Sequence, residues 1–429
     1  MLSRSPASYD LFVTEQRASM SLRRAAAWSL LDQVLLSAVH FGVGLAVLRL
    51  SDKADYGVYV IGWSLLLLLA GLQNAFVTTQ MTLRTAGLSQ PRSVQAAFLV
   101  GQFLLYAPLA ATMLAVAAWC AAFFPGSRHH AVVAVVIVVA FAGVSLREFV
   151  RNGLFAAGAA RQVFLIDAVY ATTLALVTAA CALWLPRSEL GIAALLALGG
   201  ASAVAAATTL RDLLPLCTWR SGRQALRDNS NNGLWAAGGV AVTHFQSQAY
   251  IYVLSLFSGP TTTAEANAAR LLLMPISLAL TSLQRVLYPR WIALVRAGDH
   301  AALRSLSRHT AAALTVVVIL YALALDHASR WLIAGVLGPE YGASGAYLFM
   351  FSALVWSEAM RTLAALRLQA NARFKDITVA NALTVAPVLI VAAALMRYLG
   401  PHTAAWAQIA GDIALALLLL RAARTESRR

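Results

Sequence analysis

The chain has 429 residues, of which 60% are apolar and 12% are charged, and its 33 basic and 18 acidic side chains give a net charge of +15. A soluble domain averages about 45–50% apolar and about 25% charged residues, so the composition excludes a soluble enzyme, a disordered chain and a collagen. The apolar residues occur in long blocks, which indicates an all-α polytopic membrane protein. Basic residues that orient membrane helices explain the positive charge better than binding to nucleic acid does. We therefore expect no nucleic-acid partner.

Hydropathy predicts a polar, basic N-terminal segment over residues 1–25 and then about twelve transmembrane helices, each near the roughly 20 residues that cross a bilayer. The expected spans are 26–48, 57–81, 94–120, 131–150, 163–185, 189–213, 233–257, 265–288, 309–326, 344–366, 377–398 and 402–421. Glycine–proline pairs such as Gly259-Pro260 and Gly400-Pro401 separate neighbouring spans. The segment 327–343 is too interrupted to span, so we expect it at the membrane interface.

The distribution of basic residues predicts the orientation of these spans. With the N-terminus inside and the chain alternating, 26 of the 33 basic residues fall in inner segments and the other seven in outer ones. Because cytoplasmic loops are enriched in Lys and Arg, this asymmetry predicts that both termini are cytoplasmic. Asp32 and Gln33 interrupt the first apolar stretch, which argues against a cleaved signal peptide.

The longest inner loop, residues 214–232, lies at the midpoint of the chain and is basic and rich in asparagine. It divides the sequence into an N-terminal six-helix half, 26–213, and a C-terminal six-helix half, 233–421, followed by a cytoplasmic tail, 422–429. Transporters are often built from two such halves around a central cavity, and we expect the same arrangement here.

Several ionisable side chains fall inside the expected spans, where a charge costs on the order of 2.5–3.5 kcal/mol and therefore needs a reason. Asp32 and Arg270 have no opposite charge one turn away on their own helices, so a water-filled cavity is one explanation for them. Asp167 lies near the inner end of the fifth span. Asp412 lies in the middle of the twelfth, where a hydrogen bond to a neighbouring helix would explain it.

Two further groups of charges have simpler explanations. Glu358 and Arg361 are three residues apart on one helix face, so either a local ion pair or a cavity explains them. Arg147, Glu148 and Arg151 lie at the inner end of the fourth span. We expect them to extend to the cytoplasmic interface.

The seventh span contains His244, Gln246 and Gln248, followed by Tyr250 and Tyr252. Alternate positions rotate around a helix, so these residues do not form a single stripe. A polar cavity wall and interhelical hydrogen bonding both explain such a pattern.

Sequence motifs for catalysis are absent. The chain has no G-x-x-x-x-G-K-[ST], no H-E-x-x-H, no G-x-S-x-G and no G-x-G-x-x-G sequence. Cys120, Cys181 and Cys217 are too scattered for a metal site or a disulfide framework. We therefore expect a protein that is not an enzyme and that needs no metal or cofactor.

Four stretches resemble a known family of membrane proteins, in the family's order and spacing. They run from Trp28 to Ser64, with Asp55-Tyr56-Gly57-Val58-Tyr59; from Leu146 to Tyr170; from Ala264 to Arg308, with Ala269-Arg270-Leu271 and Pro275; and over Gly335–Tyr341. Together they are similar to the polysaccharide transporter branch of the multidrug/oligosaccharidyl-lipid/polysaccharide (MOP) exporter superfamily, in particular to bacterial O-antigen and exopolysaccharide flippases.

The resemblance implies a flippase of the bacterial inner membrane. Such proteins move an undecaprenyl-pyrophosphate-linked oligosaccharide across the membrane by alternating access, for the synthesis of O-antigen, capsule or exopolysaccharide. The implied partners are the lipid-linked oligosaccharide, membrane lipid, and the polysaccharide polymerase with its chain-length machinery.

The resemblance also implies roles for individual residues. Arg270 matches an arginine of peptidoglycan-precursor flippases that is thought to meet the pyrophosphate of the substrate, and Arg49 is the second candidate. Asp32 is expected to hold such an arginine or to bind a coupling cation. The secondary candidates for a cavity are His244, Gln248, Asp167, Glu358 and Arg361. Many polysaccharide members have an acidic residue in the seventh span, where this chain has Ala249-Tyr250.

Three other functions remain open. A cation-coupled multidrug-type antiporter of the same fold would use Asp32 or Glu358 as its ion site. A peptidoglycan-precursor flippase would be indicated by fourteen spans, whereas the sequence predicts about twelve. A membrane glycosyltransferase or polymerase would require a large outer loop with paired acids, and the sequence has no such loop.

Overall fold

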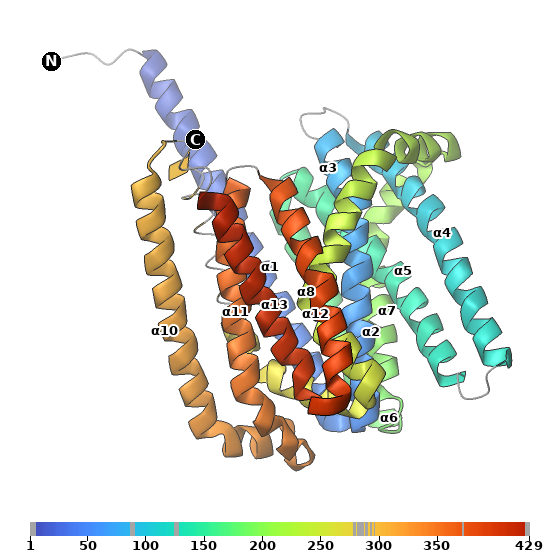
Figure 1. Ribbon diagram of the computed structural model, residues 1–429. Helices are drawn as coiled ribbons and strands as arrows, with labels where there is room; N and C mark the ends of the chain where they lie inside the picture. The colour runs from blue at the N-terminus through green and yellow to red at the C-terminus, as the bar shows by residue number, and fades with distance from the viewer. Residues whose placement is uncertain are drawn as a thin grey trace. The chain divides into compact units, whose positions relative to one another are not determined.

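The structure is a computed structural model that describes residues 6–85, 91–123, 128–277, 280, 287, 291, 294–295, 297–370 and 373–424. Within these ranges all regular secondary structure is helical and no strand occurs (Figure 1). The all-α fold expected from the hydropathy is therefore confirmed.

The helices follow one another in an order close to that of the expected spans. They are α1 (Pro6–Leu50), α2 (Lys53–Gln73), the π-helix η1 (Asn74–Thr78), α3 (Thr79–Thr85), α4 (Pro91–Phe123), α5 (Arg128–Ala156), α6 (Ala160–Trp184), α7 (Leu190–Leu213), the 3-10 helix η3 (Leu214–Leu216), α8 (Trp219–Leu272), α10 (His300–Leu332), the π-helix η4 (Ile333–Leu337), the 3-10 helix η5 (Pro339–Ser344), α11 (Gly345–Ala370), α12 (Phe374–Leu399) and α13 (His402–Arg424).

Helix α8 contains two expected spans, which are two helical segments joined by a kink at Gly259. Gly259 has φ of 80°, a left-handed conformation that glycine adopts at little cost, and Pro260 follows it. With α8 counted as two spans, the order confirms the prediction of about twelve helices. The inner loop expected at 214–232 is largely helical in the structure, as η3 and the first turns of α8.

The prediction that residues 327–343 are too interrupted for a continuous helix is only partly correct. Helix α10 continues without interruption past Asp326 and His327 to Leu332, and η4 extends the helical chain to Leu337. Both polar side chains are exposed on the helix surface, so they do not end it. Only the remainder, which is η5 after Gly338, departs from a continuous helix.

The helices have the dimensions of membrane spans. In the described part of the chain, nine helical stretches are long and apolar enough to cross a membrane. Trp184, Trp331 and Tyr398 lie near the ends of α6, α10 and α12 and are 85%, 71% and 85% exposed. Aromatic side chains at helix ends are typical of membrane–water interfaces, so the chain is a multi-pass membrane protein. The cytoplasmic location of both termini stays a prediction.

The chain forms two compact units that differ from the two sequence halves. Unit 1 consists of residues 1–43, 73–183 and 195–234, and unit 2 of residues 44–72, 184–194 and 235–429. The last residues of α1 and nearly all of α2 thus belong with the C-terminal helices.

Unit 1 has an apolar core built by η1, α3, α4, α5, α7 and the start of α8. Its buried members are Val77, Met81, Phe98, Leu99, Phe149, Leu213 and Ala225. Helices α5 and α7 approach each other closely at Gly143 and Gly199, where a Cβ on Gly143 would lie 2.0 Å from the Gly199 carbonyl oxygen. Glycine at both positions permits this contact.

Unit 2 has a core in which α13 packs against both α11 and α12 (Figure 1). The buried members are small or leucine: Ala364, Leu368, Ala380, Leu415, Ala416, Leu419 and Ala423. Small side chains allow the helices to pack closely, which is the main source of stability between helices in lipid.

The Asp55-Tyr56-Gly57 motif of unit 2 has a structural role. The Asp55 carboxylate accepts a hydrogen bond from the backbone N–H of Gly191 at the start of α7. Gly57 faces Pro260, whose carbonyl oxygen would lie 2.0 Å from a Cβ at position 57. Asp55 and Gly57 each contact the backbone of another helix. These two residues of the motif therefore contribute to helix packing.

Candidate functional sites

Unit 1 contains a buried cluster of charges centred on Asp167 of α6, which is fully buried. Its Oδ1 lies 2.8 Å from Nε and 2.7 Å from Nη2 of Arg147 on α5. Its Oδ2 accepts a hydrogen bond of 2.6 Å from Nε of Arg151, one turn further along the same helix. One carboxylate thus holds two guanidinium groups, an arrangement of short, charge-assisted hydrogen bonds.

Two further carboxylates complete this unit-1 cluster. Asp32 of α1, which is 2% exposed, accepts a hydrogen bond of 3.0 Å from Nη2 of Arg151. Glu148 lies 3.2 Å from Nη1 of Arg151 and 3.6 Å from Nη1 of Arg147. Three carboxylates therefore face two guanidinium groups, and with every group ionised the cluster carries one excess negative charge.

The expectation that Arg147, Glu148 and Arg151 extend to the interface is wrong. Arg147 is 3% exposed and turns inward to Asp167, and Arg151 links three acidic side chains. The separation in sequence hides these pairs, since Asp32 and Asp167 are on other helices. The one available signal was the coincidence of depth: all lie near the expected inner ends of their spans.

A histidine and a tyrosine pack beside the unit-1 cluster. The guanidinium carbon of Arg147 lies 3.6 Å from the centre of the Tyr170 ring. The Tyr170 hydroxyl lies 2.9 Å from Nε2 of His40, on α1. A cation over an aromatic face is stabilised when water is excluded, so Tyr170 helps to hold Arg147 in place. Sequence analysis did not identify either Tyr170 or His40 as part of a site.

Unit 2 contains a second buried pair, between Arg361 of α11 and Asp412 of α13. Nε of Arg361 lies 2.9 Å from Oδ1 of Asp412, whose side chain is 1% exposed. Gln246 and Ser357 donate to the same carboxylate at 3.3 Å and 3.4 Å. Glu358, the partner expected for Arg361 on the same helix, is farther away at 3.7 Å. The hydrogen bond expected between Asp412 and a neighbouring helix is present.

Arg270 lies on α8 after the bend and has neutral partners. Its Nη1 donates to the Tyr250 hydroxyl at 2.8 Å and to Oε1 of Gln248 at 3.2 Å. The Tyr250 side chain is fully buried and packs against Phe351. Among the residues that the structure describes, no carboxylate lies within ion-pair distance of Arg270, which distinguishes it from Arg147, Arg151 and Arg361.

The polar residues of the seventh span form interhelical hydrogen bonds. Gln246 bonds Asp412 on α13 and accepts from Thr384 on α12. His244 contacts the Tyr252 hydroxyl at 2.9 Å, and Ser64 of α2 lies 3.0 Å from that hydroxyl. Interhelical bonding therefore accounts for Gln246, while Gln248 supports Arg270.

Arg49 makes contacts at the end of α1 in unit 2. Its Nη2 donates to the carbonyl of Gly335 at 2.7 Å, and the side chain is exposed. Nearby in sequence, Lys53 forms an ion pair of 2.8 Å with Glu265. The Gly335 carbonyl belongs to η4, so Arg49 ties this π-helix to α1.

Across the described ranges, no group of three or more His, Cys, Asp or Glu side chains is arranged to hold a metal ion.

Comparison with known proteins identifies the fold. No family model and no curated protein sequence matches the chain. A solved structure of a multidrug resistance MATE family transporter of the MOP superfamily, in its inward-facing conformation, matches with a TM-score of 0.63 and 13% identity, over 92% of this chain and 94% of that chain. A MOP superfamily transporter from Pyrococcus furiosus matches with a TM-score of 0.56 and 14% identity, over 95% of each chain.

A eukaryotic transporter gives the same result. The MATE transporter AtDTX14 matches with a TM-score of 0.57 and 12% identity, over 94% of this chain and 96% of that chain. At these identities the likeness concerns the fold, and it extends over nearly the whole length of each protein. The chain is therefore a polytopic membrane protein with the MATE-type fold of about twelve helices.

Proposed function

We propose that this chain is an alternating-access transporter that moves an undecaprenyl-pyrophosphate-linked oligosaccharide across the bacterial inner membrane for surface polysaccharide synthesis. The likeness to a MATE transporter in both inward-facing and outward-facing conformations supports transport by alternating access. The lipid-linked substrate is supported by the sequence resemblance to polysaccharide flippases and by the environment of Arg270.

Arg270 is the observation that carries the proposal. A guanidinium has five N–H donors, and among the described residues only Nη1 of Arg270 is used, on the neutral oxygens of Gln248 and Tyr250. With no carboxylate at ion-pair distance in the described part of the chain, the guanidinium keeps its other N–H groups for a ligand. Arginine forms bidentate contacts with phosphate, so a pyrophosphate is a suitable partner.

The buried carboxylates favour an anionic over a cationic substrate. Asp167 and Asp32 accept hydrogen bonds from guanidinium groups, and Asp412 forms an ion pair with Arg361. A cationic substrate would have to displace these arginines from short contacts. An anionic substrate needs no such exchange at Arg270.

The chemistry of a lipid-linked oligosaccharide matches these requirements. Its pyrophosphate and sugars cannot enter hydrocarbon unassisted, because charged and polar groups lose their hydration there. Its polyprenyl chain stays in the lipid throughout. The transporter therefore has to shelter only the head group, with a cation for the pyrophosphate.

The test is the Arg270→Ala variant in a strain that depends on this chain for surface polysaccharide. We expect export to be lost while the protein is still inserted at the wild-type level, measured by fluorescence of a fused reporter. Arg270→Lys should recover part of the activity, because it retains the charge without the bidentate geometry. Arg330→Ala, which removes an exposed arginine at the end of α10, is the matched control and should export normally. Normal polysaccharide levels in Arg270→Ala would overturn the assignment.

A cation-coupled antiporter is the second candidate, and the excess negative charge of the unit-1 cluster favours it. A proton or Na⁺ bound beside Asp32 would neutralise that charge. Deletion of the gene should then increase drug sensitivity and leave surface polysaccharide intact, and Asp32→Asn should reproduce that sensitivity. The lipid-linked substrate predicts the reverse, with loss of polysaccharide and no change in drug sensitivity.

A further inference from the structure

The first turns of α8 in unit 1 present three arginines on one face. Arg220, Arg223 and Arg227 are exposed and lie at positions i, i+3 and i+7. At about 100° per residue this spacing places them within one face of a helix. We call these three residues the basic face.

The opposite side of the same turns is buried and fixes the helix to unit 1. Gly222, Ala225 and Asn229 repeat at i, i+3 and i+7 on that side and are buried. A Cβ on Gly222 would lie 2.4 Å from the Val100 side chain of α4, so the two helices are in close contact there. The Asn229 amide donates to the Ala225 carbonyl at 2.6 Å.

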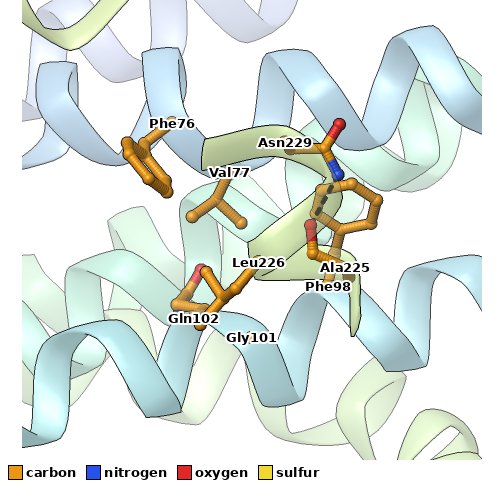
Figure 2. Close-up of a pocket in the computed structure, with 8 residues that line it drawn as sticks. All are labelled: Phe76, Val77, Phe98, Gly101, Gln102, Ala225, Leu226 and Asn229. Carbon is orange, nitrogen blue, oxygen red and sulfur yellow. Dashed lines mark hydrogen bonds between the residues drawn. The ribbon is translucent and has the colours of Figure 1, made fainter. Parts of the chain in front are cut away.

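Figure 2 shows a small pocket beside these turns of α8. Ala225, Leu226 and Asn229 of α8 line it together with residues of η1 and α4, among them Phe76 and Gln102. These turns of α8 are therefore packed against unit 1, and the arginines of the basic face lie on their other, exposed side.

Exposed apolar side chains precede the basic face in the chain. Leu214, Leu216 and Trp219 are 60%, 45% and 69% exposed. Leu214 and Leu216 are at the end of the candidate membrane span Leu190–Leu216, and Trp219 begins α8 directly before the basic face. Apolar side chains beside clustered arginines, at the end of a membrane span, are typical of a helix that lies at a bilayer surface.

We propose that the basic face and the three apolar side chains before it form a docking surface for anionic phospholipid head groups. Phosphate oxygens would accept hydrogen bonds from Arg220, Arg223 and Arg227, while Leu214, Leu216 and Trp219 enter the adjacent acyl region. This surface anchors one end of unit 1 to the leaflet, whatever substrate the protein transports.

Charge complementarity selects the anionic lipid as the occupant. Asp228, the acidic residue that follows Arg227, is directed to Arg84 at 3.7 Å, which reduces its competition for the basic face. Arginine also forms bidentate contacts with phosphate. A neutral phosphatidylcholine surface would offer phosphate together with a repelling cation, so it should bind less well.

The test uses the purified full-length chain in detergent micelles that contain increasing fractions of phosphatidylglycerol. The measured quantity is the fraction at which the thermal unfolding midpoint has risen halfway. An arginine beside an anionic surface contributes roughly a fivefold gain in affinity. The triple variant R220Q/R223Q/R227Q should therefore require roughly 100-fold more anionic lipid, or show no stabilisation.

A matched control separates this surface from a general effect of net charge. The triple variant R187Q/R330Q/R397Q removes three exposed arginines, one between α6 and α7 and two near the ends of α10 and α12, and changes the charge by the same amount. It should retain the wild-type response. Equal losses in the two triple variants would overturn the proposal, and so would equal stabilisation by phosphatidylcholine. Glycerol phosphate added without lipid tests whether the arginines bind free phosphate. If it stabilises the wild type as much as phosphatidylglycerol does, the lipid assignment is also overturned.

A second measurement tests the apolar part of the surface. Lipids brominated in the acyl chains quench tryptophan that contacts them, and the difference between the wild type and Trp219→Phe isolates Trp219. We expect a quenched component that is absent in Trp219→Phe. Equal quenching in the two proteins would show that Trp219 does not enter the membrane and would refute this part of the proposal.

Discussion

The Asp167→Asn substitution tests whether the unit-1 cluster is held by geometry or only by charge balance. Asp167 receives three guanidinium contacts, of 2.8 Å and 2.7 Å from Arg147 and of 2.6 Å from Arg151. Asparagine keeps the shape but presents an N–H₂ group to these donors. At least one buried guanidinium N–H then loses its acceptor.

The expected cost follows from burial. Removing one partner of a buried ion pair costs about 3–5 kcal/mol, because the remaining charge is left uncompensated. Asp167 is fully buried and Arg147 is 3% exposed, so solvent cannot replace the lost contacts. At roughly 2–4 °C per kcal/mol, the unfolding midpoint should fall by about 10 °C.

Asp32→Asn is the matched comparison, since it makes the same change of charge in the same cluster. Asp32 accepts a hydrogen bond of 3.0 Å from Arg151, and the asparagine carbonyl can still accept it. Its removal of one negative charge also leaves the cluster neutral. The expected loss is about 1 kcal/mol or less.

The assay is thermal unfolding of the purified variants in detergent, followed by intrinsic tryptophan fluorescence. The double variant Arg147→Met with Asp167→Leu should recover much of the stability, because it removes both charges of one pair. Asp167→Asn with wild-type stability, or Asp32→Asn with the larger loss, would refute the geometric explanation.

Two further substitutions test unit 2 by the same unfolding assay. Arg361→Ala should lower stability by about 3–5 kcal/mol, because it leaves the buried Asp412 carboxylate without its cation; a loss below about 1 kcal/mol would contradict this. Gly57→Ala should also be strongly destabilising, because its Cβ would overlap the Pro260 carbonyl. Gly42→Ala is the control with no neighbouring atom within 4 Å, and it should gain up to about 1 kcal/mol from helix propensity. Similar effects at the two glycines would show that the close contact does not exist.

Hydropathy was sufficient to predict the helices because each membrane span has to satisfy its own backbone hydrogen bonds and present apolar side chains to lipid. Gly259 and Gly400 marked two of the bends from composition alone, and both have positive φ in the structure. Hydropathy was less accurate for α10. Asp326 and His327 lowered the apolar average there, although a helix can place polar groups on its surface without ending.

The candidate site was only partly accessible to sequence reasoning. Arg270 was identified from a motif, and its neutral partners Gln248 and Tyr250 lie 22 and 20 residues away. Partners within one turn are visible in a sequence, as for Glu358 and Arg361. That local pair proved weaker than the contact between Arg361 and Asp412, which comes from another helix.

The sequence by itself determined that this chain is a multi-pass bundle of about twelve helices, because the cost of placing polar groups in hydrocarbon acts on each segment separately. Tertiary structure alone decided which charges neutralise one another. Asp32, Arg151 and Asp167 meet from three different helices. Ion pairing depends on distances of a few ångströms between side chains, and only the packing of the helices sets those distances.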